Sequence, residues 1–211
     1  MATTVKRTKR AKPSPKALAR EVDRLERALY RQKALLEKKR HALPPQEVLN
    51  YVFAGHDGKS LSLSEAFGAK DDLIVVHNMG VRCPMCTMWA DGVDGVSAHL
   101  RDRAGLLVVS DDPVRTQKAF VKARGWRFPM ASSGGTTFFR DMGFAAEDGS
   151  PWPGVSAFHR EPDGRILRVG RSGFGPGDDF CPTYGFLALL RDGVGGWWPQ
   201  LSYGKPRKGK G

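Results

Sequence analysis

The sequence predicts an α/β fold in which a central mixed sheet is flanked by helices, with a β-hairpin and a long helix on its N-terminal side. Two continuous apolar runs, Leu73–His77 and Leu106–Ser110, are typical of buried parallel strands. Helical segments follow both runs, and strands that alternate with helices build sheets covered on both faces. A later pair of strands around an Asp-Gly turn adds an antiparallel hairpin, which makes the expected sheet mixed.

The N-terminal third begins with a helix and continues with a hairpin. Apolar residues recur at helical spacing from Ala17 to Ala42, and Pro44-Pro45 ends the pattern. The members of this stripe are Leu18, Val22, Leu25, Leu29 and Leu36. The stripe indicates either a coiled-coil arm that forms a homodimer or a helix packed on its own domain, and its short, broken course favours the second. An alternating strand over 48–53 and a second strand near Ser60-Leu61 then predict a hairpin.

The remaining elements follow the two buried strands. Asp112 and Pro113 suit the N-cap and first position of a helix that runs to about Arg124. The other expected elements are a short helix over 62–67, a helix over 84–101, an edge strand over 128–131, a helix over 135–142, hairpin strands over 155–158 and 165–169, and a last helix over 182–191.

The charge of the chain separates its tails from its body. The net charge is +12, but residues 1–20 hold seven bases and no acid, and residues 205–211 hold four bases. We therefore expect a disordered basic tail over 1–15, an amphipathic helical arm over 16–43, a folded domain over 46–195, and a Gly/Trp-rich basic tail over 196–211. The tails lack the interleaved aromatic residues that stack on bases, so nucleic-acid binding is not the favoured function.

Composition also indicates the compartment. No apolar run approaches the roughly 20 residues that cross a membrane, and the basic N-terminus lacks the apolar stretch of a secretory signal. The three cysteines form an odd set that fits a reducing environment better than a disulfide framework. We expect a cytoplasmic protein with no membrane partner.

The pair Cys83 and Cys86 is the main candidate site. Cys-x-x-Cys spacing lets a second thiol resolve a mixed disulfide formed at the first. Cys83 stands where a strand gives way to a helix, whose first turn stabilises a thiolate, and Arg82 adds a neighbouring cation. Pro84 suits an early helical position. The pair would then be catalytic, with a redox-active disulfide and no added cofactor.

The rival interpretation of the pair is a structural zinc site. Such a site needs four ligands, usually two cysteine or histidine pairs. The other candidate ligands show no second pair at ligand spacing; they are Cys181, His41, His56, His77, His99 and His159. Thiol chemistry is therefore favoured over zinc, and no metal is expected. Cys181 is given no catalytic role.

Several stretches resemble a family of predicted dithiol–disulfide oxidoreductases known as the domain of unknown function DUF899, related to the peroxiredoxin and thiol-reductase branch of thioredoxin-like proteins. The stretches are Tyr51-Val52-Phe53 with Asp57-Gly58-Lys59, Cys83-Pro84-Met85-Cys86-Thr87-Met88-Trp89-Ala90-Asp91, Gly125-Trp126-Arg127-Phe128-Pro129, and Pro153-Gly154-Val155-Ser156-Ala157-Phe158. The resemblance spans roughly residues 15–190. It implies a thioredoxin-like fold and a thiol-redox activity, without fixing the substrate.

The resemblance also suggests residues around the dithiol. In thioredoxin-like folds a cis-proline that packs against the dithiol begins a late strand, and Trp152-Pro153 occupies that place, so we expect a cis bond and a docking edge there. His77 lies near the position at which thioredoxins carry a buried acid. It is either a proton shuttle or a strand-end histidine with satisfied hydrogen bonds, and the second is favoured. Asp91 is either a proton carrier or a solvated residue, and Trp89 is expected to pack under the dithiol.

The expected function is thiol–disulfide exchange on a protein or small-molecule disulfide, with electrons from a donor such as a thioredoxin or glutathione system. Two alternatives stay open. A peroxiredoxin-like peroxidase would need a threonine and a proline shortly before the attacking cysteine, and residues 77–82 contain neither. The other is a non-enzymatic thioredoxin-fold module whose basic tails bind nucleic acid or acidic partners.

Overall fold

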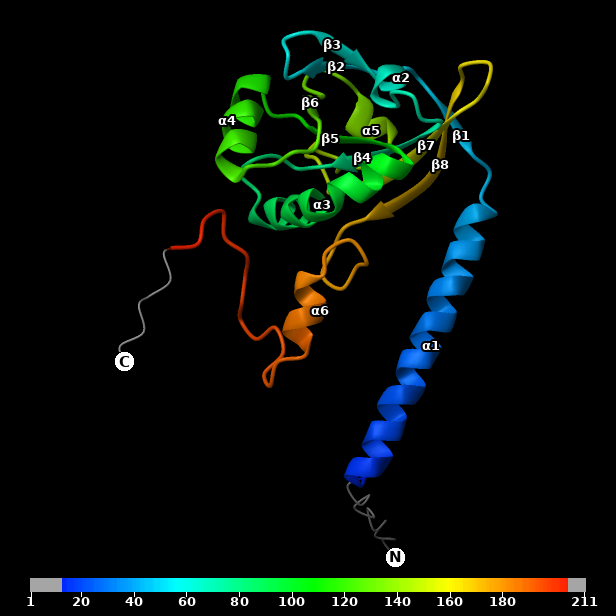
Figure 1. The fold of residues 1–211 in the computed structure, drawn as a ribbon, viewed down its shortest axis with the longest axis vertical. Coiled ribbons are helices and arrows are strands. Elements are labelled where there is room, and N and C mark those ends of the chain that lie inside the picture. The colour runs from blue at the N-terminus through cyan, green and yellow to red at the C-terminus, as the bar shows by residue number, and fades with distance from the viewer. Residues whose placement is uncertain (1–12, 205–211) are drawn as a thin grey trace, which may run out of the picture. The chain divides into compact units, whose positions relative to one another are not determined.

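The structure, a computed structural model, describes residues 13–204 of the chain, which divides into two compact units at the boundary between Pro44 and Pro45 (Figure 1). Most of the N-terminal tail expected over 1–15, and the basic residues 205–211, lie outside the described residues. The first unit is dominated by one helix. The second contains a single eight-stranded sheet and five helices among the described residues.

Helix α1, Pro15–His41, is the predicted N-terminal helix. It begins after Ser14, whose hydroxyl accepts a hydrogen bond from the Ala17 N–H, and its last turn is basic, which suits the negative end of the helix dipole. No residue of α1 is buried, and its apolar stripe is 48–57% exposed. Both interpretations of the stripe, a dimer arm and packing on the domain, stay predictions. No helix within 13–204 combines the length and apolar character needed to span a membrane.

The sheet is mixed, as predicted. Its strands are β1 Gln46–Val48, β2 Val52–Gly55, β3 Ser60–Ser62, β4 Asp72–His77, β5 Gly105–Ser110, β6 Met130–Ser132, β7 Gly154–Arg160 and β8 Ile166–Gly173. They lie in the order β1-β8-β7-β4-β5-β6-β2-β3. Strand β5 is parallel to its two neighbours, β4 and β6, and the remaining pairs are antiparallel.

The single strand expected over 48–53 is divided between distant positions in the sheet. Val48 ends β1, which pairs with β8, while Val52 begins β2, which pairs with β3 in the predicted hairpin. Six strand spacings of a flat sheet would cover about 29 Å, but the four residue steps from Val48 to Val52 span at most about 14 Å. The sheet must therefore curl. Tyr51 anchors the crossing, because its ring packs edge-on against Phe138.

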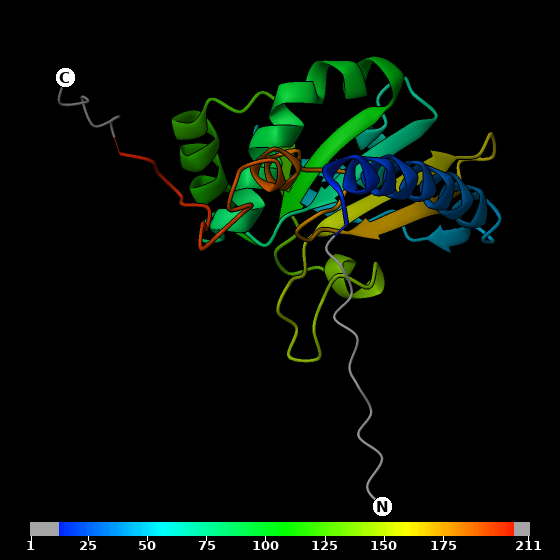
Figure 2. The ribbon, with the colours of Figure 1, turned by 90° about the horizontal axis from the view of Figure 1, so that it is seen from below.

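Helices cover both faces of this sheet. The helices of one face are α3 Pro84–Arg103 and α4 Val114–Arg124, and those of the other are α2 Leu63–Ala66 and α5 Phe138–Asp141; the last helix is α6 Thr183–Ala188. Two buried clusters define the faces: one joins Val76 and Val108 to α3, and the other joins Val75 and Val109 to α5. Figure 2 shows α3 and α4 on one side of the sheet and α5 on the other.

Two local expectations are corrected. The strand predicted over 128–131 is not an edge strand, because β6 pairs with β5 and β2. Asp112 does not cap α4, which begins after Pro113 without a side-chain cap. The Asp112 carboxylate instead accepts hydrogen bonds from the Val81 N–H and the Ser110 hydroxyl. A carboxylate engaged by a neighbouring loop is not available to the N–H groups of its own helix.

Candidate active site

The dithiol lies at the start of α3, where the sequence predicts it. Cys83 is the N-cap residue with extended backbone angles, and Pro84 follows in the first turn. Cys83 is partly exposed, whereas Cys86 is buried at 3% exposure. The Cys86 N–H donates a hydrogen bond of 3.2 Å to the Cys83 sulfur. One sulfur of the pair is thus accessible to a substrate, and the other stands behind it.

The same geometry separates the pKa values of the two thiols. The pKa of Cys83 is lowered to about 6, mainly because the Cys86 thiol donates a hydrogen bond to the Cys83 sulfur. Burial opposes this shift, and the N–H groups of Cys86 and Met85 add to it. The pKa of Cys86 is raised, because its proton is held by Cys83, its side chain is buried and the neighbouring thiolate repels a second charge. Near neutral pH the pair therefore holds one proton, and Cys83 carries the charge.

Alkylation of the reduced protein should follow this lowered pKa. Because only the thiolate reacts, the rate of iodoacetamide labelling at Cys83 should rise with pH around a midpoint near 6 and reach a plateau by about pH 7.5. Mass spectrometry of the peptide containing Cys83 measures the rate without a contribution from buried Cys181. In the control Cys86→Ala the side-chain donor to the Cys83 sulfur is lost, and the midpoint should move upward. A wild-type midpoint at 8.5 or higher would contradict the geometry.

Two polar residues hold the loop before the dithiol: Asn78, which is not among the predicted site residues, and Asp112, which is predicted only as a helix cap. The Asn78 side chain accepts from the Gly80 N–H at 2.8 Å and donates to the Cys86 carbonyl at 3.4 Å. Asp112 accepts from the Val81 N–H at 2.9 Å. Gly80 has a φ of +107°, and a Cβ there would lie 2.6 Å from Asp112 Oδ2, so this position requires glycine. The signal was present, because Asn78 and Asp112 follow the carboxyl ends of parallel neighbours β4 and β5.

His77 is placed away from the dithiol. Its ring lies on the sheet face opposite to α3 and is stacked on the Phe144 ring, with 4.1 Å between the ring centroids. Its Nε2 is 2.9 Å from Ser156 Oγ. Burial, with a smaller effect of the Arg168 charge, lowers the pKa of His77 to about 3, and its Nδ1 has no hydrogen-bond partner within the described part of the chain. A neutral imidazole on the face opposite to α3 agrees with the favoured interpretation, a strand-end histidine, and disfavours the alternative of a proton shuttle. The alternation of strand side chains puts Asn78, not His77, beside α3.

The expected cis-proline is also corrected. No peptide bond within residues 13–204 is cis, so the Trp152–Pro153 bond is trans. The trans form is the intrinsically favoured one, and in it the Pro153 carbonyl accepts from the Phe174 N–H while Gly154 pairs with His77. Pro153 nevertheless precedes β7 beside the carboxyl end of β4, the end from which the dithiol loop leaves. Trp152 is 59% exposed.

The remaining candidates have structural partners. The buried Trp89 indole donates to Asp178 at 2.8 Å and clusters with Cys181 and Tyr184, so it holds the segment after β8 against α3. Asp91 forms an ion pair with Arg124 and accepts from the Trp126 indole, which joins α3 to the end of α4. Arg82 is exposed. Among the described residues, the structure brings neither Trp89 nor Asp91 into hydrogen-bond contact with the dithiol.

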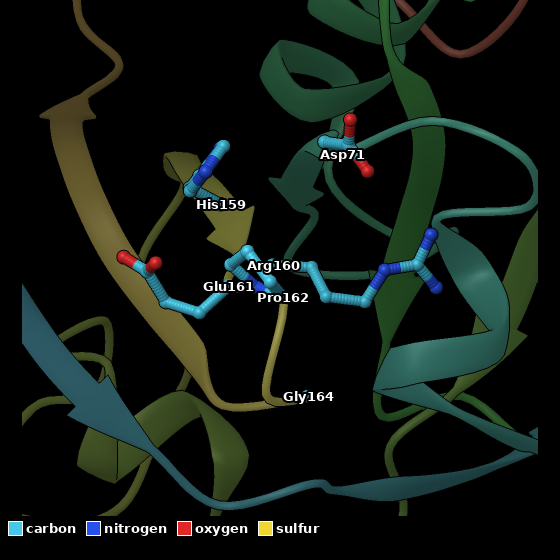
Figure 3. Close-up of a pocket in the computed structure, with 6 residues that line it drawn as sticks. All are labelled: Asp71, His159, Arg160, Glu161, Pro162 and Gly164. Carbon is cyan, nitrogen blue, oxygen red and sulfur yellow. The ribbon is translucent and has the colours of Figure 1, made fainter.

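Two further features bear on ligands. Within 13–204 no three His, Cys, Asp or Glu side chains gather closely enough to hold a metal ion. A hollow of about 420 Å³ lies beside the β7–β8 turn (Figure 3). Its lining includes Asp71, just before β4, and His159 and Arg160 at the end of β7. Because the dithiol follows the opposite end of β4, this hollow is not part of the candidate site.

Comparison with known proteins identifies the family. The model of a family described as "Bacterial protein of unknown function (DUF899)" matches residues 7–195. This chain belongs to the DUF899 family. The sequence resemblance is thereby confirmed over most of the chain, including α1 and the dithiol. Among curated proteins, none is found to match the DUF899 chain.

Solved structures establish the fold of this DUF899 protein. Peroxidoxin BcpB from Mycobacterium tuberculosis is 20% identical, with a TM-score of 0.50 over 61% of this chain and 84% of that one. A PrxQ mutant from Xylella fastidiosa is 17% identical, with a TM-score of 0.50 over 63% and 86% of the two chains. At these identities the likeness concerns the fold alone. The predicted thioredoxin-like α/β fold is confirmed.

Proposed function

We propose that this DUF899 protein is a dithiol–disulfide oxidoreductase. The observation that supports the proposal is the asymmetry of the two thiols: Cys83 is accessible with a pKa lowered to about 6, and Cys86 is buried with a raised pKa. Disulfide exchange requires an accessible thiolate that attacks the substrate and a second thiol that loses its proton to resolve the mixed disulfide, and Cys83 and Cys86 fit these two roles.

In the proposed reaction the Cys83 thiolate attacks one sulfur of a substrate disulfide. The substrate S–S bond breaks, a mixed disulfide forms at Cys83, and the leaving thiolate takes up a proton. Cys86 then loses its proton and attacks the Cys83 sulfur, which releases the second substrate thiol. The two electrons gained by the substrate come from the pair, which becomes the Cys83–Cys86 disulfide. An external dithiol or glutathione-type donor restores the reduced pair, and exposed Trp152 with Pro153 forms an edge at which the substrate docks.

The test is reduction of insulin disulfides by the full chain with dithiothreitol as the electron donor, followed as precipitation of the free insulin chains. We expect clear acceleration over dithiothreitol alone. A parallel assay follows consumption of hydrogen peroxide with the same donor. Faster turnover of peroxide than of insulin would replace the proposal with the peroxidase alternative. An inactive protein that carries one zinc ion per chain as purified would overturn it.

A further inference from the structure

A hollow of about 500 Å³ lies between the dithiol loop and α4. It is lined by Val81 of the loop and by one side of α4, namely Arg115, Thr116, Ala119, Phe120 and Ala123. Most of this lining is apolar, and the Phe120 ring makes an edge-on contact with the Trp126 ring, with 5.3 Å between the ring centroids. The α4 residues that line the hollow are exposed, except for half-buried Phe120, so the hollow is an open surface and not an enclosed pocket.

The hollow lies close to the attacking thiol, because Val81, which lines it, belongs to the same hydrogen-bonded loop as Cys83. Val81 is two residues before Cys83, which places their Cα atoms within about 7 Å. The Val81 N–H is bound by Asp112 at the start of α4, and the Cys83 N–H donates to the Gly80 carbonyl. The loop therefore has a fixed position between the hollow and the thiol. A molecule whose disulfide reaches Cys83 can lay its flanking part in the hollow.

Basic residues surround this surface. Helix α4 contains four bases and no acid over its eleven residues, and Arg82 stands next to Cys83. Within the described chain, Arg82, Arg115, Lys118 and Lys122 are exposed and form no ion pair, whereas Arg124 is paired with Asp91. The nearby acids are engaged in hydrogen bonds: Asp111 accepts from Ser133, and Asp112 from Val81 and Ser110. The cations are left to attract a negative partner.

We infer that this surface selects disulfides in polypeptide segments that carry acidic residues and a large apolar side chain; the inference rests on the proposed function. The apolar group fits the hollow, and carboxylates fit Arg82 and the α4 cations. The spread of the cations favours a polypeptide over a small anion, because Arg115 and Lys122 are about 10 Å apart along the helix axis. An extended chain covers that distance with about three residues.

The experiment uses three synthetic peptides, each with one internal disulfide and one leucine, whose flanking residues are Glu, Gln or Lys. The full chain reduces each peptide with dithiothreitol as the donor, in 20 mM and in 500 mM NaCl. At low salt we expect kcat/KM to be about tenfold higher for the Glu peptide than for the Lys peptide. The preference should shrink at high salt, because the cations are exposed.

Two variants with equal changes in net charge separate the surface from the overall charge. The test variant is Arg115→Glu/Lys118→Glu/Lys122→Glu, and the control variant is Lys59→Glu/Arg101→Glu/Arg191→Glu, three exposed positions outside the dithiol loop and α4. We expect the test variant to lose or reverse the preference for the Glu peptide and the control variant to keep it.

The outcomes distinguish this inference from the function on which it rests. Binding of a Glu peptide with both cysteines replaced by serine, measured by fluorescence anisotropy, reports the surface without turnover. Binding that the test variant loses, with no reduction of any peptide, would support the surface and refute the proposed function. Reduction of all three peptides at equal rates would refute the surface alone. Loss of random-DNA binding in the test variant, with unchanged peptide kinetics, would assign the surface to nucleic acid and overturn the inference.

Discussion

Replacement of Cys83 with serine is expected to abolish disulfide reduction by this protein. The serine hydroxyl remains protonated at neutral pH, so the variant lacks the thiolate that attacks the substrate, and insulin reduction should fall by at least about a hundredfold. Cys86 cannot replace it, because that thiol is buried and its pKa is raised. Initial rates of insulin precipitation, compared with dithiothreitol alone, measure the loss.

Cys86→Ser is the matched substitution, and it should act differently. The attacking thiol remains, so the first step proceeds, but no resolving thiol releases the product. Turnover should fall about tenfold or more, and a mixed disulfide between Cys83 and the substrate should accumulate and be visible by mass spectrometry. Equal loss in both variants without any trapped adduct would contradict the assigned order of attack. Retained activity in Cys83→Ser would show that another group attacks.

Gly154→Ala is expected to cause the largest loss of stability. Gly154 begins β7 and pairs with His77 on one side and Gly173 on the other. A Cβ at this position would lie 2.1 Å from Phe144 Cε1 and 2.6 Å from the Ser172 carbonyl oxygen. Phe144 cannot turn aside freely, because it is buried and stacked on the His77 ring. We expect the free energy of unfolding to fall by about 3 kcal/mol or more.

Gly173→Ala provides the control for this prediction. It lies opposite Gly154 on β8, has no positive φ, and offers open space to a new Cβ. Its free energy of unfolding should stay within about 0.5 kcal/mol of wild type. Urea unfolding followed by circular dichroism measures both variants. Equal midpoints for Gly154→Ala and Gly173→Ala would contradict the prediction, because they would mean that Phe144 and the β8 backbone accommodate a Cβ at position 154 with no loss of unfolding free energy.

Local sequence pattern was sufficient for several elements. The apolar runs that became β4 and β5, the Asp-Gly hairpin β7–β8 and helix α1 depend on the chain's own periodicity, turn residues and caps, and each appears close to its expected range. The dithiol at the start of α3 belongs to the same class, because spacing and a strand-to-helix change are properties of neighbouring residues.

Expectations that depended on distant contacts were corrected. Residues 48–53 alternate like one strand, but Tyr51 packs against Phe138, and the chain divides between β1 and β2. Asp112 has the sequence environment of an N-cap. Its carboxylate instead accepts hydrogen bonds from the N–H of Val81, which is distant in sequence, and from the hydroxyl of nearby Ser110. The surroundings of His77 depend on the position of β4 between β5 and β7, where its ring packs on Phe144 at the sheet face opposite to α3.

A mixed α/β fold and a pair of cysteines at the start of a helix are predictable from the sequence alone, because hydrophobic periodicity, turn residues and cysteine spacing are properties of residues close together in the chain. Only the folded structure shows which thiol is exposed, which residues hold the loop before the dithiol, and which distant segments Trp89 and Asp91 join to α3. Burial and hydrogen bonding join residues that the chain separates by tens of positions, and the packed sheet and its helices alone bring them together.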